Sequence, residues 1–217
     1  MAASSGPDSI TDGLVLSLDS RDTKSNPKTG TTWRDRSSIG AHFTLPSGIN
    51  TGNSIDFSDT SASRGAPTAW QVTDEMTIDT WFYSATNGTH TGCCDTLFGR
   101  YDFRFFIIGT SLYTMISFNN GGSRYYQHPN VTTGYNEWHH VLGMRRNNRF
   151  IIWVNGVERH NSTFGTGLDL YNVGDTYYFA GSRHPDLQIA KSRIWDRGLS
   201  DSEIKQLYNS DKSHFRG

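Results

Sequence analysis

Two acidic residues in one alternating segment raise the question of catalysis. Glu75 and Asp79 lie four residues apart within residues 75–83, EMTIDTWFY. Retaining glycoside hydrolysis needs two carboxyl groups about 5 Å apart, and alternation along a strand places such residues on one face. The position between them is Thr77, and no other acidic pair has a suitable spacing on an expected central strand. We therefore interpret Glu75 as the start of a strand and Asp79 as a solvated residue on its outer face, and we predict no catalytic residues and no enzyme.

A second group of side chains has the chemistry of a sugar-binding site. Aromatic rings stack on pyranose rings, while Arg, His and Asp side chains can bind sugar hydroxyl groups. Two expected loops supply both kinds of residue: Tyr125, Tyr126, His128, Arg183, His184 and Asp186. Ordinary loop packing and surface polarity are the alternative explanation, because two adjacent tyrosines of an extended segment face opposite ways.

The remaining reactive residues favour structural roles. Cys93 and Cys94 are adjacent, so a disulfide between them would close a strained ring, and we interpret them as free thiols. We predict no metal site there, since no second pair of Cys or His residues repeats at a suitable spacing. Alternation sends His139 and His140 to opposite faces of one strand, where we expect them to pack as structural residues.

These residues need a scaffold, and residues 138–158, WHHVLGMRRNNRFIIWVNGVE, predict its clearest part. Two alternating runs flank a polar turn at residues 146–149, and the dipeptide Asn155-Gly156 predicts a second tight turn. We expect a meander with Trp138, His140, Leu142 and Met144 on one face, and with Phe150, Ile152 and Val154 as the partner face.

Similar runs recur through the chain at intervals of about ten residues. Expected strands include residues 14–18, 42–45, 54–57, 69–72, 75–83, 96–100, 103–109, 111–118, 177–181 and 188–196. Ser200 and Glu203 form a capping box, and Ile204, Leu207 and Tyr208 then recur at helical spacing. The pattern predicts an all-β fold, a two-sheet antiparallel β-sandwich of jelly-roll type with one short C-terminal helix.

Size and charge narrow the class of protein further. With 217 residues, 35% of them hydrophobic, the chain can bury one good core, so we predict one domain at residues 13–217 after a flexible arm at residues 1–12. The formal charge of −1 gives no basis for nucleic-acid binding. The sequence has no apolar run of about 18 residues and no signal peptide, so we expect a protein without membrane contact.

Three segments carry a resemblance to a known family: EMTIDTWFY, YNEWHHVLGMRRNNRFIIWVNGV and IAKSRIWDRGLSDSEIKQLYN. In this order and spacing they resemble the laminin G-like branch of the concanavalin A-like lectin/glucanase superfamily, over nearly the whole chain. The opening GLVLSLDSRDTKSNPKTGTTWRDRSS looks like the start of laminin G-like domains of tailed bacteriophages. The resemblance implies a jelly-roll sandwich in which residues 138–156 form a central hairpin.

The resemblance also bears on hydrolysis and on metal binding. Glucanases of this superfamily carry two glutamates and an aspartate on one strand, and this chain departs from that pattern at Thr77. Many relatives bind calcium through loop carboxylates and carbonyl oxygens. Asp169, Asp175 and Asp186 are the calcium candidates, although they form no concentrated run of ligands, so we assign no cofactor and keep calcium as an alternative.

Two functions follow as hypotheses. In the first, the chain is a non-catalytic structural virion protein of a tailed phage, a capsid decoration or head-fibre module on the virion surface that can also adhere to glycans. Its partners would be capsid or tail proteins and cell-surface glycans, and it could form a homo-oligomer such as a trimer, attached through residues 1–12 or 211–217. In the second, it is an extracellular carbohydrate-binding adhesion module that belongs to no virion.

Overall fold

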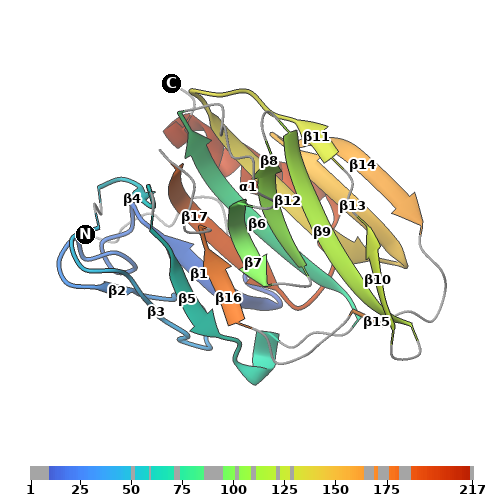
Figure 1. Ribbon diagram of the computed structural model, residues 1–217, viewed down its shortest axis with the longest axis horizontal. Coiled ribbons are helices and arrows are strands. Elements are labelled where there is room, and N and C mark those ends of the chain that lie inside the picture. Colours follow the sequence, from blue (N-terminus) through green and yellow to red (C-terminus); the bar gives the residue numbers. More distant parts are fainter. Residues whose placement is uncertain are drawn as a thin grey trace.

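Two antiparallel sheets packed face to face form the body of the protein, with one helix outside them (Figure 1). The computed structural model describes residues 10–49, 52–58, 60–70, 74–85, 95–100, 103–108, 111–120, 123–127, 130–163, 169–170, 176–180 and 187–215. The architecture confirms the predicted jelly-roll-like β-sandwich with a C-terminal helix.

The first sheet has seven strands, and its central strands come from distant parts of the chain. Its order is β1 (Leu14–Asp19), β17 (Leu187–Trp195), β6 (Met76–Ser84), β12 (Trp138–Arg146), β13 (Arg149–Val154) and β14 (Val157–Thr163), with β4 (Ile55–Asp56) paired to β17. Strand β6 therefore lies between β17 and β12, which confirms the prediction that residues 75–83 form a central strand.

The second sheet has eight strands. Its order is β10 (Ser123–Gln127), β9 (Ser111–Asn120), β8 (Phe103–Ile108), β7 (Asp95–Arg100), β16 (Thr176–Phe179) and β5 (Ala62–Gly65), with β11 (Asn130–Thr132) and β15 (Asp169–Leu170) paired to β9. A two-stranded ribbon of β2 (Thr32–Trp33) and β3 (Phe43–Thr44), the short 3-10 helix η1 (Thr68–Trp70) and the helix α1 (Asp201–Phe215) complete the fold.

The predicted meander is present as β12, β13 and β14. Its two turns use left-handed residues, with φ of 50° and 56° at Asn147 and Asn148 and of 54° and 75° at Asn155 and Gly156. Asparagine and glycine tolerate these angles better than other residues, and two consecutive left-handed residues match the twist of the flanking strands. Both predicted reversals are therefore confirmed.

The predicted partner face within the meander was wrong. In the register of β12 with β13, Leu142 lies opposite Trp153 and Met144 lies opposite Ile151. Because directly opposed residues share a face, Phe150 and its alternating neighbours face the other way, into the space between the sheets. Both faces of the hairpin are buried, one by the second sheet and one by α1, so hydrophobic alternation alone could not tell them apart.

Aromatic rings fill the space between the two sheets. Phe179 contacts four of them, at centroid distances of 5.2 Å from Trp33, 4.8 Å from Phe43, 5.8 Å from Phe57 and 4.4 Å from Phe98. Burying a large apolar side chain contributes roughly 1.5–3 kcal/mol, so this group of rings holds the long loop of Trp33 to the sandwich. The Trp33 side chain is fully buried, so it anchors this loop to the sandwich.

Two further predictions need correction. Residues 69–72 were expected to form a strand, but residues 68–70 form η1, in which the amide of Trp70 donates to the carbonyl of Pro67 at 2.9 Å. Proline favours such a turn because its φ is fixed near the helical value. Residues 211–217 were expected to form an attachment arm, but Asp211 is buried and residues 211–215 belong to α1. Residues 1–9 of the predicted N-terminal arm lie outside the described residues.

The second turn of the meander gives a test of the packing between this hairpin and α1. A Cβ atom added at Gly156 would lie 2.5 Å from Cδ1 of Tyr208, whereas one added at Gly40 would meet nothing within 4 Å. Both glycines have positive φ, of 75° and 64°. We expect Gly156→Ala to lower the free energy of unfolding by about 2–3 kcal/mol in urea titrations, and Gly40→Ala by only about 1 kcal/mol. Equal losses in the two variants would contradict close packing of the turn on Tyr208.

Candidate functional site

The outer face of the seven-stranded sheet carries a buried ion cluster centred on Asp79. The carboxylate accepts hydrogen bonds from Nε of Arg193 at 3.0 and 3.1 Å and another from Nη2 of the same residue. Nε2 of His140 lies 3.0 Å from Oδ2 of Asp79, and since a carboxylate only accepts, this nitrogen carries the proton. Asp79 and His140 have no exposed surface. The prediction that Asp79 is solvated was therefore wrong, because α1 covers this face.

The cluster continues from the sheet to the helix and to the edge strand β1. Asp211 on α1 accepts a hydrogen bond from Nζ of Lys191 at 2.7 Å, and its other oxygen lies 3.0 Å from Nη2 of Arg193, outside hydrogen-bond geometry. Nζ of Lys191 also lies 3.0 Å from Oδ2 of Asp19. A chain of alternating charges thus connects β6, β17, α1 and β1.

Mutual charge keeps these groups ionised despite their burial. Burial by itself would raise the pKa of Asp79, but the charge of Arg193 and the hydrogen bonds from His140 and Arg193 lower it. For Asp211, burial again acts upward, while the charges of Arg193 and Lys191 bring the pKa down to about 2. Burial disfavours the charged form of Arg193, but Asp79 and Asp211 outweigh it and raise the pKa of the guanidinium.

An aromatic stack closes the same face beside the ion cluster. Trp81 contacts Phe215, His140 and Tyr208 at centroid distances of 4.5, 5.1 and 5.9 Å, with its ring nearly parallel to each. The indole is fully buried, so its ring faces are used for packing the helix. Trp81 therefore packs α1 onto the sheet and is not open to a ligand.

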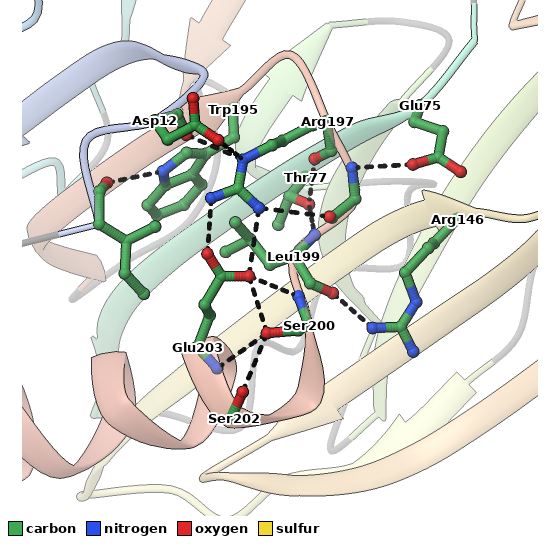
Figure 2. A network of polar contacts seen from close by, with 12 residues as sticks. Asp12, Glu75, Thr77, Arg146, Trp195, Arg197, Leu199, Ser200, Ser202 and Glu203 are labelled. Carbon is green, nitrogen blue, oxygen red and sulfur yellow. Dashed lines mark hydrogen bonds and ion pairs between the residues drawn. The ribbon is translucent and has the colours of Figure 1, made fainter.

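Figure 2 shows a second polar network, which fixes the start of α1. The Ser200 amide donates to Oε2 of Glu203 at 2.7 Å and the Glu203 amide donates to Oγ of Ser200 at 3.3 Å, which confirms the predicted capping box. Arg197 donates to both carboxylate oxygens of Glu203, at 2.6 and 3.1 Å, and this hydrogen bonding lowers the pKa of Glu203 to about 2. Its guanidinium also pairs with Asp12 at 3.1 Å, which connects the N-terminal segment to the helix.

Glu75 belongs to this network as well (Figure 2). Its Oε1 accepts the amide of Asn147 at 2.7 Å and its Oε2 accepts the amide of Gly198 at 3.3 Å, so it joins the first meander turn to the turn before α1. The prediction that Glu75 begins the central strand is confirmed, since β6 starts at the next residue. Glu75 and Asp79, the two acidic residues considered for catalysis, thus both have hydrogen-bond partners within the protein.

A groove of about 230 Å³ opens at the edge of the helix, where α1 no longer covers the sheet. Ser17 pairs with Arg193 and Asp19 pairs with Lys191. These two pairs lie two positions apart along the strands, on the same face, and form the floor of the groove. The complete lining is Ile10, Thr11, Leu14, Ser17, Asp19, Asp22, Arg36, Lys191, Arg193, Trp195 and Leu207. The groove therefore combines one apolar wall with a charged floor and rim, which we regard as the candidate site.

The structure does not test the predicted sugar-binding site. Tyr125 and Tyr126 are successive residues of β10, paired with Phe118 and Ser117 of β9. The other four candidates lie outside the described residues: His128, Arg183, His184 and Asp186. That site stays a prediction.

The assignment of no cofactor, with calcium as the alternative, also stays a prediction. Asp169 lies in β15, opposite Asn119, while Asp175, Asp186 and both cysteines fall outside the described ranges. Among the residues that the structure describes, no group of three His, Cys, Asp or Glu side chains is placed to hold a metal ion. Within the same part of the chain, no helix has the length and hydropathy to cross a membrane.

Sequence reasoning missed the ion cluster, although two signals pointed to it. Lys191 and Arg193 lie two residues apart in a strand whose other residues are mostly apolar. Asp211 follows Ile204 and Leu207 at helical spacing, so the pattern indicates that it lies on the buried side of α1. An acidic residue on a buried helix stripe indicates a cation beneath it, because unpaired charges are rarely buried.

The lowered pKa of Asp211 gives a test of the cluster by acid. A group whose pKa is lower in the folded state contributes stability above its unfolded pKa, near 3.9, and loses it as pH falls toward the folded value of about 2. We expect Asp211→Asn to cost about 3 kcal/mol in urea unfolding at pH 7. We also expect this variant to lose less stability than the wild type between pH 5 and pH 2.5.

Glu158→Gln is the matched control, because Glu158 is exposed on the edge strand β14, outside the ion cluster. We expect this change to shift the free energy of unfolding at pH 7 by less than about 0.5 kcal/mol. Parallel stability curves of Asp211→Asn and the wild type in acid would show that the cluster does not contribute as described.

Solved structures of similar fold are binding domains of bacterial toxins. The botulinum neurotoxin serotype D binding domain aligns with a TM-score of 0.73 at 14% identity, covering 93% of this chain and 51% of that one. The binding domain of Paraclostridial Mosquitocidal Protein 1 gives 0.72 at 15%, covering 91% and 52%. A serotype D ligand-binding domain in complex with N-acetylneuraminic acid gives 0.73 at 16%, covering 93% and 52%. This chain thus spans about half the length of these structures, and at such identities the likeness shows the fold alone.

Comparison by sequence assigns the family. No curated protein matches the chain. A laminin G family model, described as the concanavalin A-like lectin/glucanases superfamily, matches residues 49–205, which include β6, the meander and the start of α1. The chain belongs to the concanavalin A-like lectin/glucanase superfamily.

Proposed function

We propose that this protein is a non-catalytic glycan-binding module. The observation that carries the proposal is the sandwich itself, which is shared over 93% of this chain with a ligand-binding domain in complex with N-acetylneuraminic acid. The described surface also offers a groove with both hydrogen-bonding and apolar groups, the combination that sugars require. Glycan binding is thus the activity that the fold and the groove support together.

The engagement of the strand carboxylates favours binding over hydrolysis. A retaining glycosidase needs a nucleophile and an acid that both reach the glycosidic bond. Asp79 has no exposed surface beneath α1, and the Glu75 oxygens accept two backbone amides from neighbouring turns. Asp79 is closed off from a sugar and both Glu75 oxygens already accept hydrogen bonds, which supports binding over hydrolysis by this pair.

The proposal is tested by separating binding from turnover. We expect the fluorescently labelled protein to bind a subset of glycans on a broad array, with calorimetric dissociation constants that are micromolar to millimolar for the isolated sugars. The same glycans, incubated with the protein and analysed by mass spectrometry, should be recovered uncleaved. Cleavage products would overturn the non-catalytic assignment, and failure to bind any glycan on the array or in calorimetry would overturn glycan binding. Titrations with calcium and with a chelator extend the test to the untested metal.

We further propose that the module is displayed on a virion surface, alone or as a symmetric oligomer. This proposal is supported by the resemblance of residues 13–38 to the openings of phage-encoded laminin G-like domains. In the structure this segment forms β1 and leads into the Trp33 loop, both of them integral to the sandwich.

Mass spectrometry of purified particles tests this location. We expect peptides of the chain to copurify with capsid or tail proteins through a density gradient, and antibodies against the chain to label intact particles in electron micrographs. Particles that carry capsid and tail proteins without this chain would contradict the virion role and would leave the glycan proposal unaffected.

A further inference from the structure

We propose that the groove between β1, β17 and α1 binds one uncharged sugar ring. The inference rests on the proposed glycan binding and gives it a site and a ligand class. The groove lies on the helix-bearing face of the seven-stranded sheet, whereas Tyr125 and Tyr126 belong to β10 of the other sheet. Its residues come from segments at both ends of the described chain, which β1 and β17 bring together.

The size of the groove sets the size of the ligand. Pockets for drug-sized ligands enclose roughly 300–1,000 Å³. At about 230 Å³, the groove is smaller than this range and suits a ligand of one ring rather than an extended oligosaccharide. Further sugar units would extend past the rim, where Asp22 and Arg36 are 40% and 47% exposed.

The floor offers partners for hydroxyl groups of either polarity. Asp19 and Lys191 form an ion pair with side chains 25% and 17% exposed, so the edge of the pair faces the groove. A hydroxyl group donates to the carboxylate and accepts from the ammonium, which a sugar can do with neighbouring hydroxyls. Ser17 lies two positions before Asp19 on the same face of β1. Within the described residues, no hydrogen bond involves its hydroxyl.

The opposite wall offers apolar surface. Ile10 and Leu14 pack against the cluster of residues beneath α1, and Leu207 of the helix completes this side of the groove. The indole nitrogen of Trp195 donates to the carbonyl of Ile10 at 2.9 Å, which holds the N-terminal segment in place as a wall. One face of a pyranose ring is apolar, so a ring lying between this wall and the polar floor satisfies both of its surfaces.

The charge balance favours a neutral ligand over an acidic one. Four carboxylates meet three cations in and directly behind the groove: Asp19, Asp22, Asp79 and Asp211 against Arg36, Lys191 and Arg193. Each of these cations already has a carboxylate within 4 Å. An incoming carboxylate would have to displace one of them, at the cost of leaving a negative charge without its partner. N-acetylneuraminic acid is therefore the informative negative ligand.

Amide chemical shifts of the full-length, 15N-labelled chain test the proposal directly. The probes are the methyl glycosides of glucose, galactose, mannose and N-acetylglucosamine, with N-acetylneuraminic acid as the acidic comparison. We expect at least one neutral glycoside to shift the amides of Ser17, Asp19 and Lys191, with a dissociation constant on the order of a millimolar for a single ring. N-acetylneuraminic acid should leave these amides in place.

Two variants change the groove and leave every charged residue of the Asp79–Arg193–Asp211–Lys191–Asp19 cluster in the sequence. Ser17→Leu fills the floor with apolar volume, and Arg36→Ala removes a hydrogen-bond donor from the rim. We expect affinity for the neutral glycoside to fall at least about tenfold in Ser17→Leu and about threefold in Arg36→Ala. Arg159→Ala is the matched control, because Arg159 is also exposed but lies on the edge strand β14, outside the groove lining. The amide spectrum of each variant reports whether the fold is kept.

The outcomes separate this inference from the general function. Shifts that appear only on other elements, or affinities that Ser17→Leu leaves unchanged in a folded protein, would overturn the groove while glycan binding stands. Equal binding of N-acetylneuraminic acid in the groove would overturn the neutral ligand class. If no glycoside shifts any amide and the array is silent as well, both the groove and the proposed function fall.

Discussion

Burial of the Asp79 and Arg193 ion pair beneath α1 is the constraint on which the rest of the structure depends. Removing two charges from water costs several kcal/mol per ion, and the cost is offset only if both are fully hydrogen-bonded and paired. The chain supports the pair with groups from two further elements: His140 of β12 on one side of the carboxylate, and Asp211 of α1 beside the guanidinium. Removal of Asp79 or Arg193 leaves the other as a buried charge without its direct partner, so the central strand and β17 depend on each other.

The same constraint divides the outer face of the sheet into a closed part and an open part. Where α1 lies over β6 and β12, charges and rings face one another and no ligand can enter. Near β1 the helix no longer covers the sheet. There Asp19 and Lys191, whose side chains are partly exposed, extend the ion cluster to the surface. The groove floor is therefore rigid, since its exposed groups are the outer members of a buried network. A rigid polar floor lowers the entropy that a ligand must overcome on binding.

Most of the fold could be predicted from residue patterns, whereas the site could not. The Asn155-Gly156 turn, the capping box at Ser200 and the alternation in β6 are local signals, and each specifies its element without reference to distant residues. The solvation of Asp79 depends on what covers it, and α1 lies more than 120 residues further along the chain. The prediction of which meander residues share a face was wrong for the same reason, because a hairpin that is buried on both sides has no polar face to mark its orientation. The groove itself is formed by β1 and β17, whose pairing no local pattern encodes.

The pairing of β1 with β17 also sets the order in which the molecule can fold. Residues 14–19 are among the first of the described chain to leave a ribosome, yet their partners at 191–195 are among the last. The central strand β6 must also wait for β17 on one of its two sides. Loop closure over such separations is slow, and folds dominated by distant strand pairs reach the native state in about milliseconds to seconds. Until α1 emerges, Asp79 and Trp81 have no cover, so this face of the seven-stranded sheet closes only after β17 and α1 have been made.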